Sequence, residues 1–155
     1  MIETDRDAHL DTLPRSPLPI QLVIGFVGVK VGIHLVTNLL THYEFHRDEF
    51  LYFAMGEHFQ LWRMDIPPAI AALSVMVRGL LGESLMAIRL VPAFFGAATV
   101  LLTLLIVWEL GGRRFAFWLA GICVLLNPLL LRAGNLFQPV ALDQFAWMLG
   151  FFALA

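Results

Sequence analysis

The residue pair Asp48–Glu49 is the strongest candidate for chemistry in this chain. It follows a hydrophobic stretch long enough to cross a bilayer, in the segment His46-Arg47-Asp48-Glu49-Phe50-Leu51-Tyr52. A carboxylate at a membrane surface can act as a general base and accept a proton from an acceptor hydroxyl or amine. The alternative is a solvated loop acid without a chemical role. The pair predicts catalysis at the lipid–water boundary, with Asp48 and Glu49 as candidate catalytic residues.

Two further acids lie beside hydrophobic segments. Asp65 precedes Pro67-Pro68, and Asp143 lies near the head of the last apolar segment. Each acid can be a site carboxylate or a helix cap. Because several acids are expected on one membrane face, we predict that Asp65 and Asp143 contribute to substrate binding.

Arginines and histidines of the same region offer phosphate and metal binding. Arginine forms bidentate, charge-assisted bonds with phosphate, so Arg63 and Arg89 are candidate substrate-binding residues, with headgroup anchoring as the alternative. His42 and His46 are one helical turn apart, a spacing that can bind a divalent metal. The alternative is a pair of interfacial histidines, because no HExxH-type pattern surrounds them. No cofactor is required by any motif in the sequence, and a divalent metal is the one cofactor that His42 and His46 could bind.

The composition predicts an integral membrane protein. Hydrophobic residues make up 59% of the chain and charged residues 14%, with a mean hydropathy of +0.79. A soluble surface of ordinary charge density cannot be built from so few charges. The net charge of −2 argues against a nucleic-acid partner, which needs a clustered basic face. Cys123 is the sole cysteine and lies in an apolar run, where it is expected to act as a small hydrophobic residue.

The elements that must position these side chains are helices. We predict an all-α, polytopic transmembrane bundle: a polar tail over residues 1–18, then one helical domain over 19–155. The spans are expected at about 20–40, 90–110, 115–131 and 141–155, separated first by an outer loop over 41–89. The last run stops before it could cross about 30 Å of hydrocarbon. We therefore expect the front part of a longer protein, and no activity from an isolated fragment of this length.

The outer loop is expected to hold helices of its own. From Glu49 to Arg63 the pattern is typical of an amphipathic helix lying along the membrane surface. Pro67-Pro68 opens an apolar stretch over 69–81, whose length favours an interfacial or re-entrant helix over a full span. Whether residues 69–88 cross the membrane completely stays open.

The first span carries a lysine and a row of glycines. Lys30 lies near its middle, where a charge is costly and marks a functional hypothesis; the alternative is that Lys30 snorkels or pairs with an acid elsewhere in the bundle. Gly25, Gly28 and Gly32 form an arrangement that can let helices approach closely. A secondary transporter that uses Lys30 and buried acids for ion coupling is one alternative function. A non-catalytic membrane scaffold is another, and it leaves the acid-rich loop without a purpose.

The orientation follows from where the loop 69–81 lies. If this segment does not cross, the tail and Arg113–Arg114 share one side, and Asp48, Glu49, Asp65 and Asp143 share the other. The positive-inside rule favours a cytoplasmic Arg113–Arg114, although four arginines would then lie in the outer loop. Charge alone does not settle the orientation.

Several motifs in order resemble those of the polyprenyl-phosphate-sugar-dependent GT-C glycosyltransferases. The chain is most similar to the bacterial family that resembles protein O-mannosyltransferases and the aminoarabinose transferase of lipid A. The resemblance covers the chain from about Tyr43 to its end. Its matching segments are Arg47-Asp48-Glu49-Phe50-Leu51-Tyr52, Asp65-Ile66-Pro67-Pro68-Ala69, Leu81-Gly82-Glu83-Ser84, Ala87-Ile88-Arg89-Leu90-Val91-Pro92-Ala93, Gly111-Gly112-Arg113-Arg114 and Asn127-Pro128 before Asp143.

The resemblance implies a GT-C bundle with juxtamembrane helices in the first outer loop. It places the catalytic base on the aspartate of a DE pair, here Asp48 with Glu49 beside it, and assigns an acid of the second outer loop to the site, here Asp143. The aminoarabinose transferases have a lysine before the two prolines, where this chain has Ile66. Binding of the donor phosphate is therefore expected from Arg63 or Arg89.

The resemblance also implies an activity. The expected protein is an inverting glycosyltransferase of the cell (inner) membrane that takes a sugar from a polyprenyl-phosphate-linked donor. The acceptor is a protein, a lipid or a glycan, and transfer takes place on the extracytoplasmic side.

Overall fold

The chain forms an all-α membrane helical bundle. The computed structural model describes residues 17–40, 44–61 and 66–155. Two of its helices are long and apolar enough to cross a membrane: α2 (Ile20–Leu40) and α5 (Leu85–Glu109). The predicted first span agrees with α2 at both ends, whereas α5 begins about one turn before the predicted residue 90. The predicted polar tail lies almost wholly outside the described residues.

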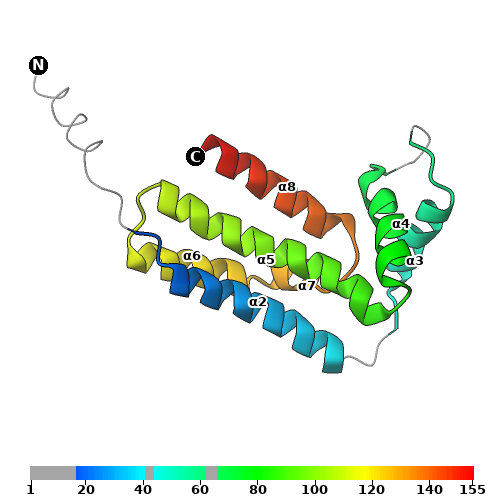
Figure 1. Ribbon diagram of the computed structural model, residues 1–155, viewed down its shortest axis with the longest axis horizontal. Helices are drawn as coiled ribbons and strands as arrows, with labels where there is room; N and C mark the ends of the chain where they lie inside the picture. Colours follow the sequence, from blue (N-terminus) through cyan, green and yellow to red (C-terminus); the bar gives the residue numbers. More distant parts are fainter. Residues whose placement is uncertain (1–16, 41–43, 62–65) are drawn as a thin grey trace, which may run out of the picture.

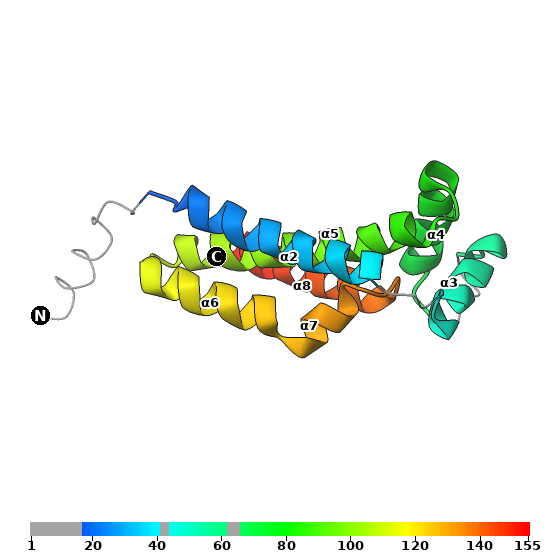
Figure 2. The ribbon, with the colours of Figure 1, turned by 90° about the horizontal axis from the view of Figure 1, so that it is seen from below.

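Helix α5 is the centre of the bundle. It packs against α2, α6 (Arg114–Leu126) and α8 (Pro139–Leu154), and the four axes run roughly side by side in both views (Figures 1 and 2). An apolar core lies between α2, α5 and α6. Its buried members are Val23, Phe26, Val100, Leu104, Phe117 and Leu125.

The predicted span 115–131 is wrong as a single helix. The structure ends α6 at Leu126 and begins a short helix, α7 (Pro128–Ala133), at an angle visible in Figure 2. Pro128 has no N–H to continue a helix, and the Asn127 side chain accepts hydrogen bonds from the Leu129 and Leu130 amides. The Asn-Pro pair therefore stops one helix and caps the next.

The segment predicted as an outer loop contains a pair of helices at one end of the bundle: α3 (Arg47–Glu57) and α4 (Ala69–Leu81). Helix α4 has the predicted bounds, because Pro68 precedes it and Gly82 ends it with a φ of +75°. Helix α3 ends at Glu57 and is shorter than the amphipathic helix predicted over 49–63. The two helices approach closely at Gly56, where an added Cβ would collide with Ser74.

A second apolar core joins this helix pair to the bundle. It is built by α3, α4, α5 and the turn before α8, and its buried members are Phe53, Ile70, Val77, Ile88 and Phe137. Arg78 of α4 bonds to Glu57 and Glu83 and lies over the Phe53 ring, 5.4 Å from its centroid. Hydrogen bonds to Glu83 and then to Glu57 raise the pKa of Arg78, so it stays charged.

Asp48 and Arg113–Arg114 belong to opposite ends of the bundle. Helices α3 and α4, the start of α5 and the start of α8 lie at one end, and the turn between α5 and α6 lies at the other (Figure 1). The segment that carries Asp48 thus lies at the end of the bundle opposite the turn that carries Arg113–Arg114.

Candidate active site

The first turn of α3 is built by a reciprocal cap. His46 is the N-cap residue, and its Nδ1 accepts the Asp48 N–H at 3.3 Å. In return, the Glu49 carboxylate accepts the His46 N–H at 2.7 Å. This capping box fixes both acids in the first helical turn, where the positive end of the helix dipole favours carboxylates.

Glu49 is a completely buried anion paired with Arg89. The exposed fraction is 0% for Glu49 and 4% for Arg89. Arg89 donates from Nη2 to Glu49 Oε2 at 3.1 Å and from Nε to Oε1 at 3.4 Å. Arg89 Nη2 also donates to the Glu44 carbonyl at 3.0 Å, and the Phe137 N–H donates to Glu49 Oε1 at 2.9 Å. Glu49 therefore joins α3 to α5 and to the turn before α8.

Asp48 differs from Glu49 because its side chain is 35% exposed. Gln138, the N-cap residue of α8, donates from Nε2 to Asp48 Oδ2 at 3.1 Å. The exposed Arg47 side chain lies 3.5 Å from Oδ1. His46 Nδ1 lies 3.6 Å from Oδ2, but this contact is an ion pair only with a protonated ring, and Nδ1 already accepts the Asp48 N–H. The Asp48 carboxylate is thus held by Gln138 and remains partly exposed to solvent.

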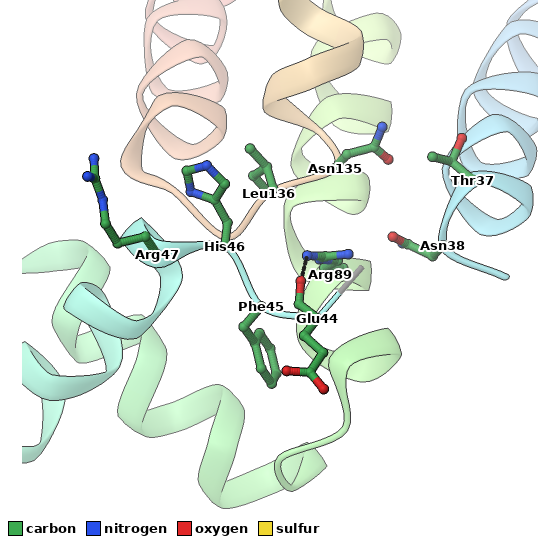
Figure 3. A pocket seen from close by; sticks show the side chains of 9 residues that line it. All are labelled: Thr37, Asn38, Glu44, Phe45, His46, Arg47, Arg89, Asn135 and Leu136. Carbon is green, nitrogen blue, oxygen red and sulfur yellow. Dashed lines mark hydrogen bonds between the residues drawn. The ribbon is translucent and has the colours of Figure 1, made fainter. Parts of the chain in front are cut away.

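An open cavity of about 680 Å³ lies beside this turn. The end of α2, the segment 44–47, Arg89 and the turn before α8 form its walls, as Figure 3 shows. The lining side chains are mostly polar: Thr37, Asn38, Glu44, Phe45, His46, Arg47, Arg89, Asn135 and Leu136. Asp48 is not among them, although it directly follows the lining residues 44–47 in the chain.

Tyr52 is a titratable side chain whose pKa depends in part on the charge of Asp48. It lies one turn further along α3 and packs against the second core. Its burial, and then the charge of Asp48, raise the pKa of Tyr52. The phenol is therefore neutral at physiological pH and can donate a hydrogen bond.

The other predicted site residues are only partly placed. Arg63, Asp65 and His42 lie outside the described residues. Asp143 is exposed on α8, and no described interaction joins it to Asp48 or Glu49. Among the residues that the structure describes, no three His, Cys, Asp or Glu side chains come together as a metal-binding group. Arg89, the predicted phosphate ligand, already uses Nε and Nη2 for Glu49 and Glu44.

Lys30 neither snorkels nor pairs with an acid in the described part of the chain. Its side chain is fully buried, and Nζ donates to the Leu130 carbonyl of α7 at 3.2 Å. Sequence reasoning also missed Gln138 and Phe137, which contact the acid pair. The available signal was the Gln138-Pro139 dipeptide, since proline at the first helical position places the preceding residue at the N-cap.

Comparison with known proteins identifies the family. Residues 67–152, more than half of the chain, match the family model described as dolichyl-phosphate-mannose-protein mannosyltransferase. The matched stretch contains Arg89, Gln138 and Asp143 and begins after Asp48–Glu49. No significant match is found to a curated protein or to a solved structure. The chain therefore belongs to the dolichyl-phosphate-mannose-protein mannosyltransferase family, a glycosyltransferase family of the GT-C type.

Proposed function

We propose that this protein is an inverting glycosyltransferase that takes a sugar from a polyprenyl-phosphate-linked donor, with Asp48 as the general base. The observation that carries the proposal is the Asp48 carboxylate itself. It is fixed in the first turn of α3 by a cap and by Gln138, and it is partly open to water at one end of a membrane bundle. The family match independently supports a glycosyltransferase.

The proposed step balances as one displacement. Asp48 takes the proton of an acceptor hydroxyl or amine, and the acceptor heteroatom forms a bond to the anomeric carbon of the sugar. The bond from that carbon to the phosphate oxygen breaks, and polyprenyl phosphate leaves with the electron pair. A single displacement of this kind inverts the anomeric configuration.

Glu49 supports this step by holding the backbone in place and does not itself transfer a proton. Its buried pair with Arg89 holds α3 against α5, which fixes the backbone beside Asp48. Negative charge on the leaving phosphate requires cationic or hydrogen-bonding groups. We assign this role to Arg63 and to the remaining N–H groups of Arg89, and we assign contact with the sugar or acceptor to Asp65 and Asp143.

The location of the chemistry is part of the proposal. The end of the bundle that carries α3 and α4 faces the extracytoplasmic side of the cell membrane. The polyprenyl chain lies among the spans, and a protein, lipid or glycan acceptor approaches from water.

The experiment is a donor comparison with the full-length protein in vesicles. We expect transfer from a polyprenyl-phosphate-linked sugar and none from the matching nucleotide sugar, with the product anomer opposite to that of the donor by NMR. Transfer from the nucleotide sugar alone, or a product that retains the donor configuration, contradicts the proposal.

A further inference from the structure

Two buried polar side chains of α2 hold the segment that leads into α8. Lys30 and His34 are one helical turn apart, and both are completely buried. Lys30 Nζ donates to the Leu130 carbonyl at 3.2 Å. His34 Nδ1 lies 2.7 Å from Asn135 Oδ1. Helix α2 therefore contacts both α7 and the turn that follows it through specific polar bonds.

Glycines make the space for these side chains. A Cβ added at Gly134 would lie 2.5 Å from His34 Nε2, and one added at Gly96 would lie 3.2 Å from Lys30 Cε. An amide oxygen only accepts hydrogen bonds, so the hydrogen of the neutral imidazole is on Nδ1. Nε2 is then a buried acceptor without a hydrogen-bond partner among the described residues. The ring has one polar bond, and that bond goes to the turn.

The other face of the same turn contacts the acid pair. Residue Phe137 donates its N–H to Glu49 Oε1 at 2.9 Å. Gln138 donates from Nε2 to Asp48 Oδ2 at 3.1 Å. Residues 135–138 therefore form a continuous stretch of chain between the imidazole of His34 in the bundle and the two carboxylates at its end.

We propose that His34 is a positioning residue for sugar transfer, acting through Asn135 and Gln138 on the orientation of the Asp48 carboxylate. The inference rests on the proposed role of Asp48 as base. Misplacing a reacting group by about 1 Å can cost about 10²-fold in rate. His34 is completely buried and does not line the cavity, so we expect its loss to lower kcat while the KM for the donor stays within about twofold.

Three substitutions of His34 in the full-length protein test this role. The side-chain amide of asparagine can occupy the place of Nδ1 and donate a hydrogen bond to Asn135. The amide of glutamine instead reaches the place of Nε2, which has no hydrogen-bond partner among the described residues. We expect His34→Leu and His34→Gln to lower kcat by about tenfold to a hundredfold, and His34→Asn to retain most of it. Thr103→Val is the control, because the Thr103 hydroxyl donates a hydrogen bond within α5, to the Thr99 carbonyl.

Coupling to Gln138 separates positioning from general damage to the fold. In a Gln138→Leu background the link to Asp48 is already cut, so adding His34→Leu changes kcat by less than about threefold. Hydrogen exchange at the Phe137 amide gives a readout independent of turnover, and His34→Leu should accelerate it.

Two results overturn the inference: equal kcat for His34→Asn and His34→Gln, or rate losses of His34→Leu and Gln138→Leu that simply multiply. The first result decides even if His34→Leu fails to accumulate. Full transfer activity in an Asp48→Asn variant would refute the proposed function as well. If Asp48→Asn is inactive while the His34 variants keep the kcat of the unchanged protein, the positioning role of His34 is refuted and the proposed function stands.

Discussion

The substitution Glu49→Gln should open the end of the bundle although it changes a single atom. Each carboxylate oxygen of Glu49 accepts one backbone N–H, Oε2 from His46 and Oε1 from Phe137. Glutamine keeps only one oxygen, so its NH2 group faces a backbone N–H whichever way the amide turns. The substitution also leaves the buried Arg89 without a counter-charge.

The size of the effect follows from the burial of the pair. Both side chains are excluded from water, so solvent screening does not reduce their interaction. Removing one partner of a buried pair costs about 3–5 kcal/mol. If this cost lowers the free energy of local opening, hydrogen exchange at the Phe137 and His46 amides accelerates by between about 10²-fold and about 5,000-fold.

The assay is hydrogen exchange followed by mass spectrometry on the protein in lipid nanodiscs. Glu57→Gln is the matched control, because Glu57 lies in the same helix and its ion pair with Arg78 is exposed, worth about 0–1 kcal/mol at most. In a double-mutant cycle, Glu49→Gln and Arg89→Met together should cost less than the sum of the two single changes, by about 0.5–3 kcal/mol. Equal exchange in the Glu49→Gln and Glu57→Gln variants would refute this reasoning.

Further predictions concern glycines, a tyrosine and topology. Gly134→Ala drives a methyl group against His34 and should destabilise the protein by about 1–3 kcal/mol in thermal unfolding, whereas Gly28→Ala, whose Cβ meets nothing within 4 Å, should be neutral or stabilising; equal effects would contradict the packing. In a Tyr43→Phe background, absorbance should show Tyr52 ionising above about pH 10. The fold should therefore lose stability from this group only as the pH rises through that range. Asp48→Asn should lower the ionisation midpoint of Tyr52 without abolishing the rise in its pKa, since burial is the larger cause. With Cys123 replaced by alanine, single cysteines at 113 and 143 should label from opposite sides of a sealed vesicle, and labelling from one side would contradict the proposed topology.

Local signals in the sequence predicted the helices well. The apolar length of α2 set both its ends, and the Pro68 and Gly82 boundaries of α4 are visible in the sequence because each residue type has a strong backbone preference. The break at Asn127-Pro128 was also readable as a cap followed by proline. The resemblance named this break, but the predicted span ran through it to residue 131 because the apolar run continues across it.

The contacts that build the candidate site could not be predicted from the sequence. Nothing in the order of residues says that Glu49 is buried against Arg89 while its neighbour Asp48 remains partly exposed, because that difference depends on how α3 packs against α5. The same holds for Gln138, which lies 90 positions from Asp48 in the chain. Gly25, Gly28 and Gly32 form an arrangement that can let helices approach closely, yet a Cβ on any of them would meet nothing within 4 Å among the described residues. Glycines that do make room for a side chain of another element include Gly56, Gly96, Gly121 and Gly134, and those partners become known only in three dimensions.

The most direct test of the account is the rate of sugar transfer by the Asp48→Asn variant of the full-length protein. Asparagine keeps the size of the side chain and an oxygen for Gln138, but it cannot accept a proton as a base. We expect normal membrane insertion and donor binding with a loss of at least about 10²-fold in kcat, in line with the contribution of general-base catalysis. Transfer at the rate of the unchanged protein would contradict the assignment of Asp48 as the catalytic base.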